Sequence, residues 1–358
     1  MHMPVAGPHT HTLFTVSRTM LTVVAALTPA TLFGLWEFGW PAIFLFLTTV
    51  VSAWVFEVAC LKIADKPIRP FATDGSAILS GWLVAMTLPP YAPWWVGVIG
   101  SFIAIVIAKH LFGGLGQNLF NPAMVARAML VVALPVQMTT WIAPVGLLEG
   151  PSFLHGLSIT FLGSQEFDAV SSASTLSHIK SQISAGATMG EILPTLADLE
   201  SRLLGFVPGS LGETSTVLLA LGGLLLLVTR IITPTIPLAV LGTLVTLSAI
   251  CSFLAPDRFA PPILHLTSGS TMLCAFFIAT DYVTSPVTTA GKWVYGIGIG
   301  TLVFVIPLRR LPRGRGLCGA LDELGHAPDR NLHPAADLRT VPHRQAACAA
   351  KPAKGAQK

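Results

Sequence analysis

The chain has 358 residues, a formal net charge of +4 and a mean hydropathy of +0.71, with 53% hydrophobic and only 11% charged residues. Soluble domains carry about 25% charged residues, so this composition excludes an ordinary soluble protein. Apolar stretches of about twenty residues, long enough to cross a bilayer, follow one another with short connections. We therefore predict an all-α, multi-pass membrane bundle whose surroundings are lipid, with no nucleic-acid partner.

The first part of the chain is expected to hold a short cytoplasmic N-terminus, residues 1–18, and a first transmembrane half, residues 19–136, of about five helices. The expected spans are residues 20–36, 42–61 and 76–88, followed by two that end near residues 110 and 135. A basic loop with Lys62, Lys66 and Arg69 follows the second span. The positive-inside rule places this loop in the cytoplasm.

Residues 137–213 form the long polar interruption of the hydrophobic body and are expected outside the cytoplasm. Acidic residues outnumber basic ones there, with Lys180 and Arg202 against Glu149, Glu166, Asp168, Glu191, Asp198, Glu200 and Glu213. Basic residues concentrate in cytoplasmic loops, so this balance agrees with the count of spans.

A second transmembrane half, residues 214–307, is expected to hold about four helices. The eighth span begins with Gly269-Ser270-Thr271, which resembles the Gly75-Ser76-Ala77 at the start of the third span. These two spans would cross the membrane in opposite directions. This pattern is typical of inverted repeats, here two halves of five helices with the last helix lost. Chance similarity is the alternative.

Residues 308–358 form an aberrant polar tail that is rich in Arg, Pro, Ala and His. Such a composition cannot bury a core, so disorder is one explanation. The other is a shifted reading frame: codons for residues 309–329 can be chosen so that the overlapping frame encodes a glycine turn and an apolar helix, the missing tenth span. Sequencing the gene across Pro307 tests this hypothesis.

The cysteines and histidines are scattered and form none of the paired spacings of zinc, haem or iron–sulfur sites, so no protein-borne metal is expected. Charged groups inside a membrane are costly and therefore indicate function. Glu57, Asp74 and Asp281 are candidates for an ion pathway. An N-cap for the third span is an equally good explanation of Asp74.

The body of the chain, from about Arg18 to Pro307, resembles the family that contains the D subunit of the Rnf ferredoxin:NAD oxidoreductase and the B subunit of the sodium-pumping NADH:quinone oxidoreductase. The resemblance rests on EVACL (57–61), DGSA (74–77), GGLGQNLFNPAM (113–124), ATD (279–281), TSPVT (284–288) and YGIGIG (295–300). Chain length favours the D subunit. The resemblance implies a bacterial inner-membrane subunit that moves electrons across the membrane, coupled to Na⁺ or H⁺ transport, and whose partners are the other subunits of the complex.

The family carries FMN joined by a phosphoester to a hydroxyl residue in an outer loop, installed by a periplasmic flavin transferase. Its motif, Asp-x-x-Ser/Thr-Gly/Ser-Ala-Thr/Ser, matches residues 168–174, with Asp168 and Ser171 at the first two fixed positions. The acceptor position holds Ser174 where Thr is usual. Ser174 is the expected attachment site, neighbouring Thr175 is the alternative, and an empty site is the third outcome.

The glycine-rich connection at residues 113–122 permits close backbone approach, and Asn118 and Asn121 offer amide groups to a flat heterocycle. By resemblance, this connection lies near a second, non-covalent flavin, riboflavin. The alternative is a helix-breaking turn whose Asn side chains only satisfy backbone groups.

Two other classes of function fit the sequence as well. One is a transporter or channel of inverted-repeat fold without redox chemistry, and the other is a purely structural subunit. A flavin retained after denaturation distinguishes the redox subunit from both.

Overall fold

The computed structural model describes residues 15–163, 179, 182–183, 185–196, 198–212, 215–257 and 259–308, with the side chains of residues 307 and 308 excepted. The regular elements in these residues are helices, and no strand occurs among them. The predicted all-α membrane bundle is confirmed. The polar tail from residue 309 lies outside the described residues, so the shifted reading frame stays a hypothesis.

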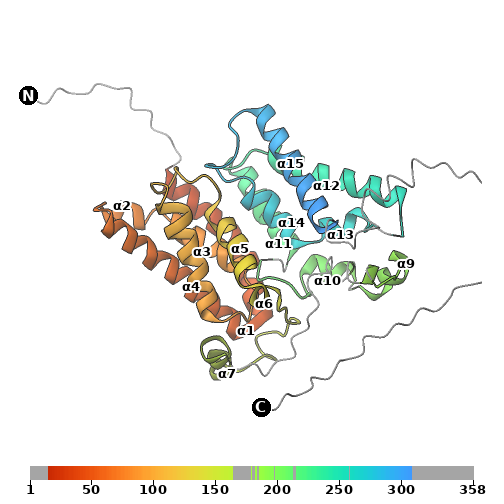
Figure 1. The fold of residues 1–358 in the computed structure, drawn as a ribbon, viewed down its shortest axis with the longest axis horizontal. Coiled ribbons are helices and arrows are strands. Elements are labelled where there is room, and N and C mark those ends of the chain that lie inside the picture. Colours follow the sequence, from red (N-terminus) through yellow and green to blue (C-terminus); the bar gives the residue numbers. More distant parts are fainter. Residues whose placement is uncertain are drawn as a thin grey trace, which may run out of the picture.

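Two groups of helices lie side by side, and a polar segment connects them (Figure 1). The first group consists of α1 (Val16–Ile63), α2 (Ile68–Ala72), α3 (Ser76–Thr87), α4 (Trp94–Phe102), η1 (Ile103–His110), α5 (Pro122–Ala133) and α6 (Pro135–Thr139). The connecting segment contains α7 (Phe153–Leu157), η2 (Ser158–Leu162), α9 (Met189–Ile192), η3 (Leu193–Thr195) and α10 (Leu199–Leu204). The second group consists of α11 (Thr216–Val228), α12 (Thr235–Leu254), α13 (Pro262–Leu266), α14 (Gly269–Leu273), η4 (Cys274–Ile278) and α15 (Thr289–Leu308).

Helix α1 is a hairpin of two arms. Gly39 interrupts its 48 residues with φ 72° and ψ −155°, a conformation that suits glycine because it has no Cβ. Trp82 of α3 contacts both arms: its Nε1 donates to Thr31 Oγ1 at 2.8 Å, and its ring packs edge-on against Phe46. The arms therefore correspond to the first two predicted spans.

Helices also form at the positions expected for the later spans. The fourth is a continuous apolar helix, Trp94–His110, whose second part η1 is π-helical. By length and composition, the helices able to cross a membrane in the described chain are α1, α12 and the Thr289–Ile306 part of α15, and shorter apolar helices complete the bundle. The relation of the two groups by an inverted repeat stays a prediction.

Both groups contribute to one hydrophobic core, in which Leu27 of α1 and Leu219 of α11 are fully buried. Glycine permits this close contact. A Cβ built on Gly222 of α11 would lie 2.3 Å from the carbonyl oxygen of Ala26 and 3.1 Å from the ring of Phe277. Small residues let membrane helices approach closely, so Gly222 fixes the seam between the groups.

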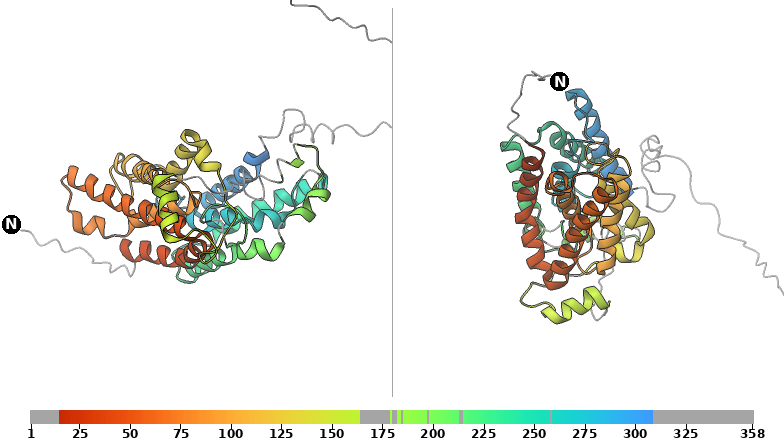
Figure 2. Two further views of the ribbon diagram at one scale, coloured as in Figure 1. Left: turned by 90° about the horizontal axis from the view of Figure 1, so that it is seen from below. Right: turned by 90° about the vertical axis from the view of Figure 1, so that its left-hand side faces the viewer.

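The polar segment lies at the end of the bundle far from the first residues of α1, where α7 and η2 run across the helix ends (Figure 2). Trp40 and Phe44 of α1 pack against Phe153 of α7, with ring centroids 5.0 and 5.2 Å apart. This aromatic contact attaches the beginning of the segment to the turn of the α1 hairpin. Residues 164–178 of the segment lie outside the described residues.

Replacing Gly222 by Val is expected to destabilise the bundle, because the added carbons would overlap backbone that cannot move aside. Overpacking of this kind typically costs about 1–3 kcal/mol. The measurement is the midpoint temperature of thermal unfolding of the full chain in detergent, with tryptophan fluorescence as the probe. Gly242→Val on α12 is the matched control, since a Cβ at Gly242 meets no atom within 4 Å. Equal midpoints for the two variants would contradict the packing assigned to the seam.

Candidate functional site

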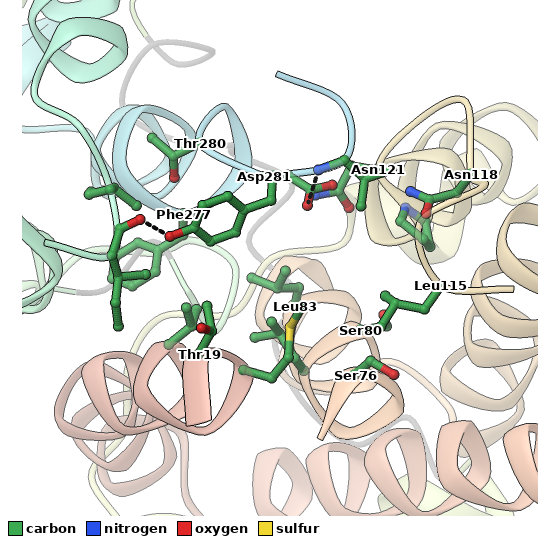
Figure 3. Close-up of a pocket in the computed structure, with 18 of the residues that line it drawn as sticks. Thr19, Ser76, Ser80, Leu83, Leu115, Asn118, Asn121, Phe277, Thr280 and Asp281 are labelled. Atoms are coloured by element: carbon green, nitrogen blue, oxygen red, sulfur yellow. Dashed lines mark hydrogen bonds between the residues drawn. The ribbon is translucent and has the colours of Figure 1, made fainter. Parts of the chain in front are cut away.

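A cavity opens between the two helix groups (Figure 3). Its lining residues Thr19 and Ile231 directly follow Arg18 and Arg230, so it lies at the end of the bundle called the basic end here. It measures about 740 Å³ including its open mouth. Both groups line it, mostly with apolar side chains. The polar and aromatic groups used below are Ser76, Lys109, Asn118 and Asn121 from the first group and Phe277 and Asp281 from the second.

The cavity brings together residues that lie far apart in the sequence. Asn118, Asn121 and Asp281, three of the predicted site residues, line it directly. The other two described site residues, Glu57 and Asp74, are connected to it by hydrogen bonds through lining residues. The predicted FMN attachment residues Ser174 and Thr175, with Asp168 and Ser171, lie outside the described residues.

The glycine-rich loop forms one rim of the cavity. Gly113, Gly114 and Gly116 all have positive φ, between 88° and 115°, a conformation that is unfavourable for residues with a Cβ. Lys66 Nζ donates to the carbonyl oxygen of Gly113 at 3.1 Å and ties the loop to the connection between α1 and α2. The loop is therefore shaped by its own glycines and anchored from outside.

Each loop asparagine uses one end of its amide for the backbone. Asn118 Nδ2 donates to the carbonyl oxygen of Phe120 at 3.0 Å. Asn121 Oδ1 accepts from Ala123 N at 3.0 Å and caps α5. Hydrogen bonds to the backbone therefore use one of the two polar atoms of each side-chain amide. The other ends, Asn118 Oδ1 and Asn121 Nδ2, are an acceptor and a donor on residues that line the cavity.

A buried ion pair lies behind the cavity. Lys109 Nζ of η1 lies 2.8 Å from Glu57 Oε2 on the second arm of α1, and both side chains are 2% exposed. His110 Nε2 lies 3.0 Å from the same oxygen. Lys109 Nζ also donates to Ser76 Oγ at 2.8 Å. Three segments of the first helix group, α1, α3 and η1, thus meet at one ammonium group.

Asp74 joins this network at the start of α3. Its Oδ1 accepts from the backbone N of Ser76 at 2.8 Å and from Ser76 Oγ at 2.6 Å. The backbone bond supports the explanation that Asp74 organises the start of the helix. The hydroxyl bond also connects Asp74 to the ion pair, because the same Ser76 Oγ accepts a hydrogen bond from Lys109 Nζ. Asp74 is therefore one hydroxyl away from the buried ammonium.

Asp281 lies on the opposite wall, after η4. Its Oδ1 accepts from Val283 N and its Oδ2 from Thr284 Oγ1, both at 3.4 Å, which is long for hydrogen bonds. Next to it, the hydroxyl of Tyr282 donates to the carbonyl oxygen of Ile231. This bond links the loop after η4 to the loop that follows α11.

The sequence did not single out Lys109 or Ser76 as site residues. Lys109 was expected only to end the fourth span, although a lysine at the end of an apolar stretch was the available signal. Ser76 belongs to the DGSA motif, of which only Asp74 was considered as a site residue. Chemically, the arrangement offers an apolar slot with amide groups on one rim and a charged, hydrogen-bonded network on the other side.

Comparison with known proteins identifies the protein family of this chain. Residues 4–314 match the NQR2, RnfD, RnfE family. The chain is similar to the D subunit of the ion-translocating oxidoreductase complex of Halorhodospira halophila, at 47% identity over 304 residues that cover 84% of this chain and 85% of the relative. The protein of the same name from Stutzerimonas stutzeri is 50% identical over 293 residues, covering 81% and 82%. That from Aeromonas hydrophila is 39% identical over 313 residues, covering 84% and 88%. The chain therefore belongs to the NQR2, RnfD, RnfE family.

Proposed function

We propose that this chain is a flavin-carrying membrane subunit of a bacterial ion-translocating oxidoreductase of the ferredoxin:NAD type. In this function it passes electrons across the inner membrane, coupled to Na⁺ or H⁺ transport. The observation that carries the proposal is one cavity that joins the amide-bearing loop to a network of buried charges. The relatives, named as subunits of an ion-translocating oxidoreductase complex, support the same class of function.

The cavity suits a flat, uncharged heterocycle such as the ring of riboflavin. The support for this ligand is the chemistry of the lining, because apolar side chains of both helix groups face amide-bearing residues across one cavity. Apolar residues such as Leu83 and Phe277 line it for the ring faces, and Asn118 and Asn121 offer an acceptor and a donor for the polar ring edge. When bound, the flavin supplies reversible electron transfer. The residues of this chain hold the ring, orient its edge and keep water away from its faces.

The second flavin in the proposal is FMN, joined by a phosphoester to Ser174 in the polar segment. A phosphoester needs an oxygen nucleophile, and the match to the family's motif rests on Asp168, Ser171 and Ser174. Thr175 is the alternative acceptor. The polar segment begins at the end of the bundle far from the first residues of α1 (Figure 2), and Thr19 and Met20 near that start line the cavity. A position opposite to the cavity would make the segment accessible to a periplasmic flavin transferase.

Ion movement in this proposal involves the carboxylates at the basic end, which the positive-inside rule places in the cytoplasm. Asp281 lines the cavity, whereas Glu57 and Asp74 reach it through Lys109 and Ser76. Carboxylates beside a redox group respond to its charge because interactions are strong in a medium of low dielectric constant. The electron donor and acceptor are assigned to other subunits of the complex.

Covalent FMN is expected on the peptide 168–180 of the purified chain. Mass spectrometry should find the FMN adduct on Ser174, and Ser174→Ala should remove both the adduct and the flavin fluorescence that survives denaturation. Ser174→Thr should retain the adduct because it keeps a hydroxyl. Thr175→Ala is the control and should leave the modification in place. An unmodified wild-type peptide, from cells with an active flavin transferase, would refute the FMN assignment.

Asn121→Asp is expected to weaken binding of the non-covalent flavin while preserving the fold. Aspartate keeps the oxygen that caps α5 but replaces the Nδ2 donor with a negatively charged oxygen. Loss of one hydrogen bond of about 1–1.5 kcal/mol corresponds to roughly tenfold weaker binding. The measurement is the amount of flavin released per chain on denaturation. Retention of a full complement of releasable flavin would show that the cavity is not its site.

Asp281→Asn is expected to impair ion transport more than assembly, since it removes a charge from the cavity wall and preserves the side-chain shape. Transport of Na⁺ or H⁺ by the complex in vesicles is the measurement, with electron transfer followed in parallel. Asp257→Asn is the control, because Asp257 is exposed in the loop before α13. Transport at the wild-type rate in the Asp281 variant would remove this residue from the ion pathway.

A further inference from the structure

The ammonium group of Lys109 lies between two places where charge matters for the proposed function. On one side it contacts Glu57 Oε2 at 2.8 Å, and the exposed fraction of both side chains is 2%. On the other side Lys109 and Ser76 are part of the cavity wall. Ser76 lies on the same side of the cavity as Leu115 of the loop (Figure 3). One buried cation is therefore in reach of both a carboxylate and the cavity's ligand.

The hydrogen bonds around Lys109 have a fixed direction. Ser76 has a single hydroxyl proton, and the carboxylate of Asp74 is the acceptor for it at 2.6 Å. Ser76 Oγ must therefore accept from Lys109 Nζ, 2.8 Å away. An ammonium group has three donors, and Glu57 and Ser76 use two of them. The third donor can serve a ligand in the cavity.

The π-helical part of the fourth span brings consecutive residues to the same oxygen. Side chains of neighbouring residues on an α-helix point about 100° apart. Lys109 Nζ and His110 Nε2 nevertheless lie 2.8 and 3.0 Å from the same Glu57 Oε2. The backbone bond from Leu111 N to the carbonyl oxygen of Val106 spans five residues, as a π-helix requires. Such local widening is frequent at functional sites.

We propose that Lys109 is a movable internal cation. It neutralises Glu57 while the cavity's ligand is uncharged, and it moves toward the cavity when that ligand gains negative charge. The carboxylate of Glu57 is then left to a monovalent cation that enters from the basic end of the bundle. This inference rests on the proposed function, because it requires a redox-active ligand in the cavity.

Charge is conserved in each step of the proposal. One electron, supplied by a donor protein of the complex, adds one negative charge to the cavity's ligand. The positive charge of Lys109 moves with it, and no bond is made or broken at the lysine. One entering cation replaces Lys109 at Glu57, so the buried region has the same net charge before and after. Reoxidation of the ligand returns Lys109 to Glu57 and expels the cation.

Other titratable groups face this network from each packed element. His110 lies beside Glu57 on η1, Asp74 contacts Ser76 at the start of α3, Cys60 lies one turn after Glu57 on α1, and Asp281 faces the cavity from the second helix group. None of them holds the position of Lys109, which contacts a carboxylate and the cavity wall together. The prediction therefore concerns Lys109 and Glu57 rather than the network in general.

The test is a redox titration of the purified complex, following the flavin signal that Asn121→Asp weakens. In the wild type, raising NaCl about a hundredfold at constant ionic strength with choline chloride should raise the midpoint potential. A tenfold preference of Na⁺ for the reduced state corresponds to about 59 mV for a one-electron couple. If the entering cation is a proton, the potential is insensitive to Na⁺, and reduction of the wild type takes up more protons than reduction of Glu57→Gln.

Two variants should shift the potential in opposite directions. Lys109→Met removes the cation that stabilises the reduced ligand, so the potential should fall. Glu57→Gln releases Lys109 toward the cavity, so the potential should rise. Both variants should lose the cation dependence seen in the wild type. General structural damage would not produce opposite shifts. Lys62→Met removes an exposed lysine from the same end of α1, and it should behave as the wild type.

Shifts of equal sign in the two variants would overturn the proposal, as would cation dependence that survives in Lys109→Met. If Lys109→Met does not assemble, the wild-type and Glu57→Gln titrations decide alone: the absence of both Na⁺ dependence and extra proton uptake in the wild type overturns it. Failure of the proposed function is a separate result. In that case no flavin signal depends on Asn121, whereas failure of this inference leaves that signal in place without any response to cations.

Discussion

The buried ion pair between Lys109 and Glu57 is the constraint on which the basic end of the bundle depends. Two charges inside a membrane protein are tolerated only when each compensates the other. Removing one partner of a buried pair typically costs about 3–5 kcal/mol, since the remaining charge is left without compensation. The pair therefore fixes η1 against the second arm of α1, and through Ser76 it also fixes the start of α3. While Lys109 contacts Glu57 and Ser76, this side of the cavity wall is therefore held in place.

The opposite wall is held by packing rather than by charge. Gly222 brings α11 into contact with the backbone of Ala26, and Phe277 packs into the same core. Between membrane helices, van der Waals contact of small residues replaces the hydrophobic effect that operates in water. The cavity is thus located where the tight seam ends, between a wall fixed by an ion pair and a wall fixed by close packing. A flat ligand placed there would contact both helix groups.

Hydrophobic length and turn residues in the sequence were sufficient to predict the helical spans, because each span is a local property of the chain. Asn118, Asn121 and Asp281 were named as candidates from the sequence, and they line one cavity, while their roles stay predictions. The prediction from sequence could not identify the partner of Glu57, since Lys109 is 52 positions away and contact across that separation is decided by helix packing. Nor does apolar periodicity distinguish the π-helical η1 from an α-helix. A lysine near a span's end normally indicates an interfacial anchor whose head group reaches water; here the same residue is 2% exposed.

Each arm of α1 carries one buried carboxyl group, Glu37 beside the hairpin turn and Glu57 at the basic end. Their surroundings differ, and the difference indicates at which end of the bundle a charge is compensated. Glu57, at the basic end, is compensated by Lys109 and approached by His110. Glu37, beside the hairpin turn at Gly39, is 3% exposed, and its Oε2 has no hydrogen-bond partner in the described part of the chain. A group of opposite charge thus compensates Glu57, whereas no described group forms a hydrogen bond with Glu37 Oε2. The compensated charge and the ligand cavity thus lie at the same end of the bundle. Any coupling of ligand charge to cation binding would therefore act at this end.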